Sequence, residues 1–106
     1  MAATSLNNSS LLLLEDEPLL RRRIAAHLGK AGAEITAVGT LAEARQALRG
    51  LEFDFALLDL HLPDGQCLAL LDDKSIPASA VTIIMTAEGG VAGAVEAMRH
   101  GAADYL

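Results

Sequence analysis

The chain alternates between short, mainly apolar runs and longer stretches in which apolar residues recur every three or four positions. The apolar runs are Leu11–Leu14, Ile35–Val38, Phe55–Leu58, Val81–Met85 and Ala103–Leu106. Short runs that are apolar on both sides are typical of strands covered by helices on both faces of a sheet. We therefore expect five strands, the last of them unfinished.

Four helical patterns lie between these runs, each with apolar residues three or four positions apart. The first begins at Pro18, a residue favoured in the first turn of a helix. Thr40 and Glu43 form a capping box at the start of the second. The third helix is expected over roughly Gln66–Asp73. The fourth has apolar residues at Val91, Ala94, Val95 and Met98 and is expected to stop at Gly101.

This alternation predicts an α/β fold built on a doubly wound, five-stranded parallel sheet. Right-handed crossovers place helices on both faces, and the expected strand order is 2-1-3-4-5. The length of 106 residues is that of one domain. We expect residues 1–10 to form a flexible leader and residues 11–106 the folded domain, which is truncated in its fifth strand and lacks its final helix.

Composition and charge exclude several classes of protein. An apolar share of 52% is too high for a disordered chain, and no apolar run approaches the roughly 20 residues of a membrane-spanning helix. The single cysteine, Cys67, excludes an internal disulfide framework and a cysteine-rich zinc site. A net charge of −6 disfavours direct binding to nucleic acid. These features predict a cytoplasmic protein that binds neither membranes nor, by this domain, nucleic acid.

Polar residues follow three of the expected strands. Glu15 and Asp16 follow the first strand, Asp59 ends the third, and Thr86 follows the fourth. Because ligands of open parallel sheets bind beyond the carboxyl ends of the strands, we expect three carboxylates and a hydroxyl in one crevice. Mg²⁺ would relieve the repulsion between the carboxylates, and one carboxylate could then attack phosphorus.

Four segments at these positions resemble the receiver domain of two-component response regulators. They are LLLLEDEP (Leu11–Pro18), FALLDLHLPDG (Phe55–Gly65), IMTA (Ile84–Ala87) and GAADYL (Gly101–Leu106). Each motif alone is weak, but all four occur in the family's order and spacing over residues 11–106. The resemblance implies a flavodoxin-like fold.

The resemblance also implies a role for each residue of the acidic site. Asp59 resembles the phosphoacceptor of the family. Glu15 and Asp16 resemble the acidic pair that holds Mg²⁺, with glutamate at a position where aspartate is also common. The backbone carbonyl of His61 resembles the third protein ligand.

A second set of residues resembles the part of the family's site that responds to phosphorylation. Thr86 resembles the switch hydroxyl that turns toward the phosphoryl group, and Tyr105 resembles the switch aromatic that follows it inward. Ala87 and Glu88 are expected to contribute to binding beside Thr86, and Glu88 lies where the family adjusts dephosphorylation.

One family residue has no counterpart in the chain. In the family a lysine lies three residues beyond the switch aromatic, and the chain ends one residue after Tyr105. The two lysines present, Lys30 and Lys74, are predicted near the end of the first helix and after the third, where neither can substitute.

The resemblance implies a signalling domain, not an enzyme. A sensor histidine kinase would phosphorylate Asp59, and the change of conformation would control a C-terminal output domain. The stretch AVEAMRHGAADYL (Ala94–Leu106) resembles receivers of nitrogen-regulation-type activators and of two-domain redox-response regulators, whose outputs bind DNA. Transcription control is therefore the expected role. Receivers often pair through the face that includes the fourth helix, so a homodimer is a further expectation.

Two other functions are consistent with parts of the pattern. A phosphate-independent interaction module with the same fold would not need the missing lysine. A phosphohydrolase of the haloacid dehalogenase type also uses a nucleophilic aspartate after a strand, but it needs a second aspartate where this chain has His61.

Three further features have purely structural interpretations. Arg21–Arg23 is predicted to form the solvated side of the first helix, and Pro63–Gly65 to supply turn residues. Cys67 is predicted to be a small buried hydrophobic residue.

Overall fold

The structure is a computed structural model, which describes residues 8–85 and the main chain of residues 104–105. Expectations that concern residues 86–103, including the fourth predicted helix, lie outside the described residues.

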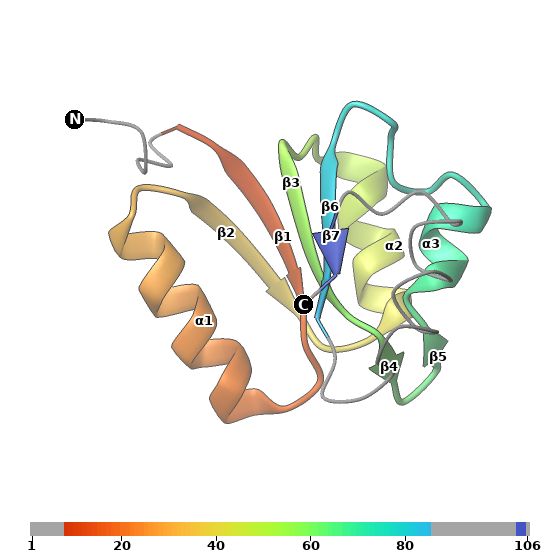
Figure 1. Cartoon of the computed structure of the whole chain (residues 1–106), viewed down its shortest axis with the longest axis horizontal. Helices are drawn as coiled ribbons and strands as arrows, with labels where there is room; N and C mark the ends of the chain where they lie inside the picture. Colours follow the sequence, from red (N-terminus) through yellow and green to blue (C-terminus); the bar gives the residue numbers. More distant parts are fainter. Residues whose placement is uncertain (1–7, 86–103, 106) are drawn as a thin grey trace.

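A five-stranded parallel sheet forms the centre of the molecule (Figure 1). Its strands are β1 (Ser10–Leu14), β2 (Glu34–Val38), β3 (Phe55–Asp59), β6 (Val81–Met85) and β7 (Asp104–Tyr105). They lie in the order β2-β1-β3-β6-β7, which confirms the predicted order 2-1-3-4-5. Two short antiparallel strands, β4 (His61–Leu62) and β5 (Gly65–Gln66), form a separate hairpin that the sequence pattern did not indicate.

The register of the sheet aligns the carboxyl ends of β1 and β3. Leu14, the last residue of β1, pairs with Val38 of β2 and with Leu58 of β3. Asp59 then pairs with Met85, the last residue of β6. Residues that directly follow these strands therefore meet at one edge of the sheet.

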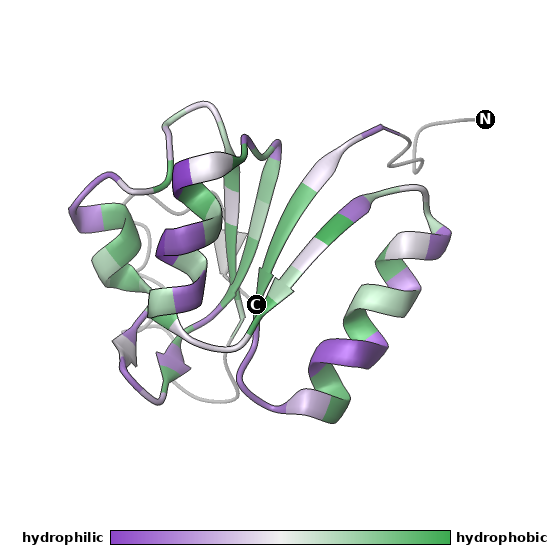
Figure 2. Cartoon of the chain, turned by 180° about the vertical axis from the view of Figure 1, so that it is seen from behind, coloured by the Kyte–Doolittle hydropathy of each residue, from purple (hydrophilic) through white to green (hydrophobic). Residues whose placement is uncertain are grey.

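Within the described residues, three helices cover the two faces of the sheet. Helix α1 (Pro18–Lys30) lies on one face, and α2 (Leu41–Gly50) and α3 (Leu68–Asp72) lie on the other (Figure 1). Figure 2 shows mainly hydrophobic strands, whereas the helices mix hydrophobic and hydrophilic residues. No helix in the described residues combines the length and apolar character that crossing a membrane requires. The described part is thus a three-layered α/β domain.

The starts of α1 and α2 follow local capping rules, with one departure from the predicted capping box. Glu17 caps α1 by accepting from the backbone N–H groups of Leu19 and Leu20. Thr40 Oγ1 accepts from the N–H of Glu43 at 3.1 Å, as the capping box requires. The carboxylate of Glu43, however, accepts from Gly39 N–H at 2.9 Å instead of from Thr40. The side chain of Glu43 thus fixes Gly39, the residue before the N-cap, rather than the N-cap Thr40 itself.

Helix α3 is shorter than the prediction of Gln66–Asp73. It begins at Leu68 because Gly65 and Gln66 pair with the strand β4. Gly65 has a φ of +141°, which side chains disfavour, and a Cβ there would lie 2.9 Å from Cδ1 of Leu41. A tight hairpin therefore replaces the predicted first turn of the helix.

The two faces of the sheet are covered unequally within the described residues. On β3, Ala56 and Leu58 are buried in the cluster that includes α2 and α3, whereas Phe55 and Leu57 are only partly buried beside α1. A largely apolar groove of about 660 Å³ is lined by residues of α1 together with Leu57 and Met85. The larger core thus lies on the side of α2 and α3.

Candidate functional site

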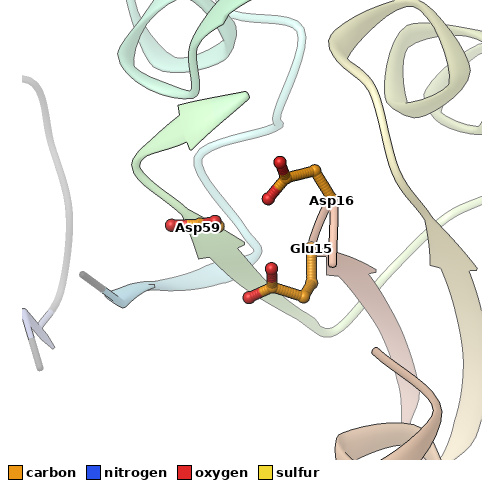
Figure 3. A group of neighbouring side chains, drawn as sticks. All are labelled: Glu15, Asp16 and Asp59. Carbon is orange, nitrogen blue, oxygen red and sulfur yellow. The ribbon is translucent and has the colours of Figure 1, made fainter. Parts of the chain in front are cut away.

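Three carboxylates meet at the edge where β1 and β3 end (Figure 3). Glu15 and Asp16 begin the loop that leads from β1 to α1, and Asp59 is the last residue of β3. One carboxylate oxygen from each residue lies within 4.8 Å of the other two. The structure therefore brings together the three acidic side chains that the sequence placed in one crevice.

The three side chains differ in their exposure to water. Glu15 is 4% exposed, Asp59 is half-buried and Asp16 is exposed. Glu15 is held in place because Oε2 accepts from the N–H of Glu17 at 3.0 Å, and its own N–H donates to Val38 at 3.0 Å. The cluster thus has a buried, fixed carboxylate on one side and an exposed one on the other.

Burial and mutual repulsion raise the pKa of both Glu15 and Asp59. Burial is the largest cause for each residue. Asp16 raises both further, and the charge of Asp59 also raises the pKa of Glu15. Backbone N–H groups only partly oppose these effects. Two carboxylates about 4 Å apart repel by about 4 kcal/mol at an effective dielectric of 20, so a bound cation would stabilise the ionised cluster.

The donor set suits a hard divalent cation. Mg²⁺ prefers carboxylate oxygens and retains several water molecules, which fits a cluster open on the side of Asp16. The nearby thiol of Cys67 is not a competing ligand, because the side chain is fully buried and burial raises its pKa to about 12. Cys67 is thus the buried, apolar residue that the sequence predicted.

The loop after Asp59 is tied to the neighbouring strand. Leu60 N–H donates to the carbonyl of Met85 at 3.0 Å, and Cys67 N–H donates to the carbonyl of Leu60 at 2.9 Å. His61 follows in β4 with an exposed side chain. Its assignment as a carbonyl ligand stays a prediction.

The residues predicted to respond to phosphorylation are Thr86, Ala87, Glu88 and Tyr105. Strand β6 ends beside Asp59, and Thr86, Ala87 and Glu88, which follow it, lie outside the described residues. Tyr105 belongs to β7, where its Cα pairs with that of Ile84 in β6. The roles of all four residues stay predictions.

Both lysines lie away from the carboxylates. Lys30 ends α1, about 18 Å along the axis from the start of the helix beside the acidic loop. Lys74 follows α3 and lines a cavity with Pro77 and Ala80, which precede β6. That loop lies at the opposite end of β6 from Asp59.

Two residues near the site have contacts that the sequence interpretation missed. Arg21, predicted as a solvated residue, donates from Nη1 to the carbonyl of Glu15 at 2.8 Å. Asp64, predicted as a turn residue, accepts from the first two N–H groups of α2, those of Leu41 at 2.9 Å and Ala42 at 3.1 Å. The short spacing from Glu15 to Arg21 is a signal that sequence reasoning could have used. The bond from Asp64 spans 23 residues and has no local signal.

Comparisons with known proteins agree with this geometry. The family model of the response regulator receiver domain matches residues 11–106. The transcriptional activator protein PfeR of Pseudomonas aeruginosa is 33% identical over 102 residues, which are 96% of this chain and 33% of PfeR. Among the most similar curated relatives, the chain spans 21–40% of each relative's length.

Solved structures support the same assignment. One is the crystal structure of a response regulator protein from Burkholderia pseudomallei with a phosphorylated aspartic acid, calcium ion and citrate. Its TM-score is 0.86 and its identity 26%, and the match covers 93% of this chain and 59% of that one. The signal receiver domain of a putative LuxO repressor protein from Vibrio parahaemolyticus has a TM-score of 0.81 and 30% identity. This match covers 92% of this chain and 76% of that one.

One assignment follows from three findings: the order of the sheet, the acidic cluster at the carboxyl ends of the strands, and the match over residues 11–106. The chain belongs to the response regulator receiver domain family of two-component signalling.

Proposed function

We propose that Asp59 is the phosphoacceptor of this receiver and that a sensor histidine kinase supplies the phosphoryl group. The observation that carries the proposal is the position of Asp59, at the end of a central strand and within 4.8 Å of two further carboxylates. Asp59 is half-buried rather than fully buried, which is consistent with access by a donor.

Glu15, Asp16 and Asp59 hold Mg²⁺ in this proposal, together with the carbonyl of His61. The close approach of three hard oxygen donors supports the assignment. When bound, Mg²⁺ neutralises charge on the phosphoryl oxygens during transfer. Without a cation, the raised pKa of Asp59 disfavours the ionised form that acts as nucleophile.

The transfer itself forms one bond and breaks one. An oxygen of the Asp59 carboxylate bonds to phosphorus while the bond from phosphorus to the histidine nitrogen of the kinase breaks. The electron pair of that bond stays on the imidazole nitrogen. The product is an aspartyl phosphate, and the domain needs no separate substrate, so its role is signalling rather than enzymatic turnover.

The response to phosphorylation is assigned to the end of β6 and to β7. Thr86 is the hydroxyl that turns toward the phosphoryl group, and Ala87 and Glu88 contribute to binding beside it. Tyr105 is the aromatic that follows Thr86 inward. Pairing of Asp59 with Met85 and of Ile84 with Tyr105 supports this route from the acceptor to β7.

We further infer that the domain acts within a transcription regulator in the cytoplasm. The name of PfeR, a transcriptional activator protein, supports a DNA-binding output domain. The net charge of −6 argues that any contact with DNA is made by such a domain, not by this one. A homodimer of receivers is a further partner in this proposal.

The proposal is tested by incubating the chain with a small acyl phosphate, with and without Mg²⁺, and measuring the intact mass. We expect one added phosphoryl group, dependent on Mg²⁺, in the wild type and in the control Asp72→Asn, which removes an exposed carboxylate on α3. Asp59→Asn should prevent the labelling. Equal labelling of Asp59→Asn, or labelling without Mg²⁺, would overturn the assignment.

A further inference from the structure

Arg21 reaches back from α1 to the loop that carries two of the acidic residues. Its Nη1 donates to the carbonyl oxygen of Glu15 at 2.8 Å and lies 3.5 Å from that of Asp16. Both acceptors are main-chain oxygens. One guanidinium therefore holds the backbone of the acidic loop and leaves the carboxylates available for a cation.

A second loop closes over the same guanidinium. A Cβ built on Gly39, the residue after β2, would lie 2.7 Å from Nη1 of Arg21 and 3.5 Å from its Cζ. Gly39 does not have a positive φ, so its backbone conformation does not require glycine. A side chain at Gly39 would therefore have to displace the end of Arg21 from its present position.

Gly39 is itself fixed by the start of α2. Its N–H donates to Oε1 of Glu43 at 2.9 Å, and Glu43 N–H donates to Thr40 at 3.1 Å. The guanidinium of Arg21 therefore lies between the acidic loop and the loop that leads into α2.

We infer that Arg21 is a positioning residue for the acidic cluster, acting on the loop of Glu15 and Asp16 from its place against Gly39. The inference rests on the proposed function, in which this cluster binds Mg²⁺. Mg²⁺ demands near-ideal octahedral geometry, so its affinity depends on how well the ligands are held before it binds. Residues that orient metal ligands commonly change affinity by about 10- to 100-fold when they are mutated.

Titration calorimetry with Mg²⁺ tests the inference on variants outside the cluster. We expect Arg21→Ala to weaken Mg²⁺ binding by about 10- to 100-fold. Arg21→Lys keeps the charge but loses the planar guanidinium, and should restore only part of the affinity. The matched control is Arg22→Ala, which removes the same charge from an exposed neighbour and should bind Mg²⁺ like the wild type.

Gly39→Ala tests the same contact without any change of charge. The added methyl group must displace the flexible end of Arg21, so Mg²⁺ affinity should fall in the same direction as in Arg21→Ala. The double variant should bind no more weakly than Arg21→Ala alone, because both changes remove one interaction. Thermal unfolding without Mg²⁺ then separates loss of affinity from loss of fold.

The outcomes distinguish this inference from the proposed function. Wild-type affinity in Arg21→Ala and Gly39→Ala, with weakened binding in Asp16→Asn, would overturn the positioning role and leave the metal site intact. A lowered melting temperature with unchanged Mg²⁺ affinity would likewise show a structural role only. Absence of Mg²⁺ binding by the wild type would instead overturn the proposed function.

Discussion

Glu15 combines nearly complete burial with a position beside two other carboxylates. Its pKa is raised first by burial and then by the charges around it, so the folded state favours the protonated form more than the unfolded chain does. At neutral pH the ionised side chain therefore lowers the free energy of unfolding of the metal-free protein. The negative charge of Glu15 thus favours metal binding but destabilises the metal-free protein.

Glu15→Gln should stabilise the metal-free protein at pH 7. Removing one charge relieves repulsion worth between about 1 kcal/mol in water and about 4 kcal/mol at a dielectric of 20, and we expect a gain near the lower value. Because a raised folded pKa penalises the ionised form, wild-type stability should increase as pH falls from 7 toward the raised pKa, above the ordinary value of 4.5.

Chemical denaturation in EDTA at several pH values measures both effects. The increase in stability on acidification should be smaller in Glu15→Gln than in the wild type. An identical dependence on pH in the two proteins would contradict the cause assigned to the raised pKa. The same variant should bind Mg²⁺ more weakly, since it loses an anionic ligand.

Cys67 should be inert toward alkylating reagents in the folded protein. The thiol is fully buried and its pKa is raised to about 12, whereas only the thiolate is an effective nucleophile. Alkylation by iodoacetamide at pH 8 should be at least about 100-fold slower than in denaturant, given a thiol pKa near 8.5 in an unfolded chain. Mass spectrometry over time measures the rates, and comparable rates would contradict the burial.

At the scale of elements, α2 connects the two loops of the site. Its first turn is capped locally by Thr40 and from a distance by Asp64, which follows β4. The same turn also holds Gly39, which lies against Arg21, because Glu43 accepts from the N–H of Gly39. The N-terminus of one helix thus fixes segments that follow β2 and β3.

Thr40→Ala should lower the free energy of unfolding by about 1 kcal/mol, because the N–H of Glu43 loses its acceptor. Thr40→Ser keeps the hydroxyl and should cost much less. Urea denaturation measures the difference between the two variants. Equal costs would indicate that the methyl group, and not the cap, accounts for the effect.

Asp64→Ala should lower the melting temperature at neutral pH by removing the carboxylate that binds Leu41 and Ala42. These N–H groups hold the pKa of Asp64 below its ordinary value of 3.8. For a lowered pKa, the stabilisation is present above 3.8 and is lost as pH falls through the folded value. Melting curves should therefore converge in strong acid, and a difference that is constant with pH would contradict a role for the charge.

At the scale of the whole molecule, the two faces of the sheet should differ in their contribution to stability. Leu58→Ala empties a fully buried position in the larger core and should cost about 2–5 kcal/mol. Leu57→Ala, the next residue on β3, changes a half-buried side chain at the groove beside α1 and should cost about 1–2 kcal/mol. Denaturant unfolding of the pair measures this, and equal costs would contradict the unequal covering.

Local sequence determined most of the sheet and three carboxylates of the site. Strands β1, β2, β3 and β6 lie within one residue of the apolar runs, because strands of a parallel sheet with helices on both faces are mainly apolar. Their order then places Glu15, Asp16 and Asp59 together without any further information, since parallel strands end at the same edge of a sheet.

Only the tertiary structure decided how the loops around that cluster are held. The hairpin at Gly65 shortened a predicted helix. The cap that Asp64 gives to α2 and the approach of Gly39 to Arg21 join residues that lie far apart in the chain. Periodicity describes which face of an element is apolar, but not which polar group of a distant loop will find an unpaired N–H or carbonyl. These hydrogen-bond partners depend on which loops come close together once the strands have paired. The unpaired N–H and carbonyl groups at the ends of helices and in loops then bond to whichever polar groups lie near them.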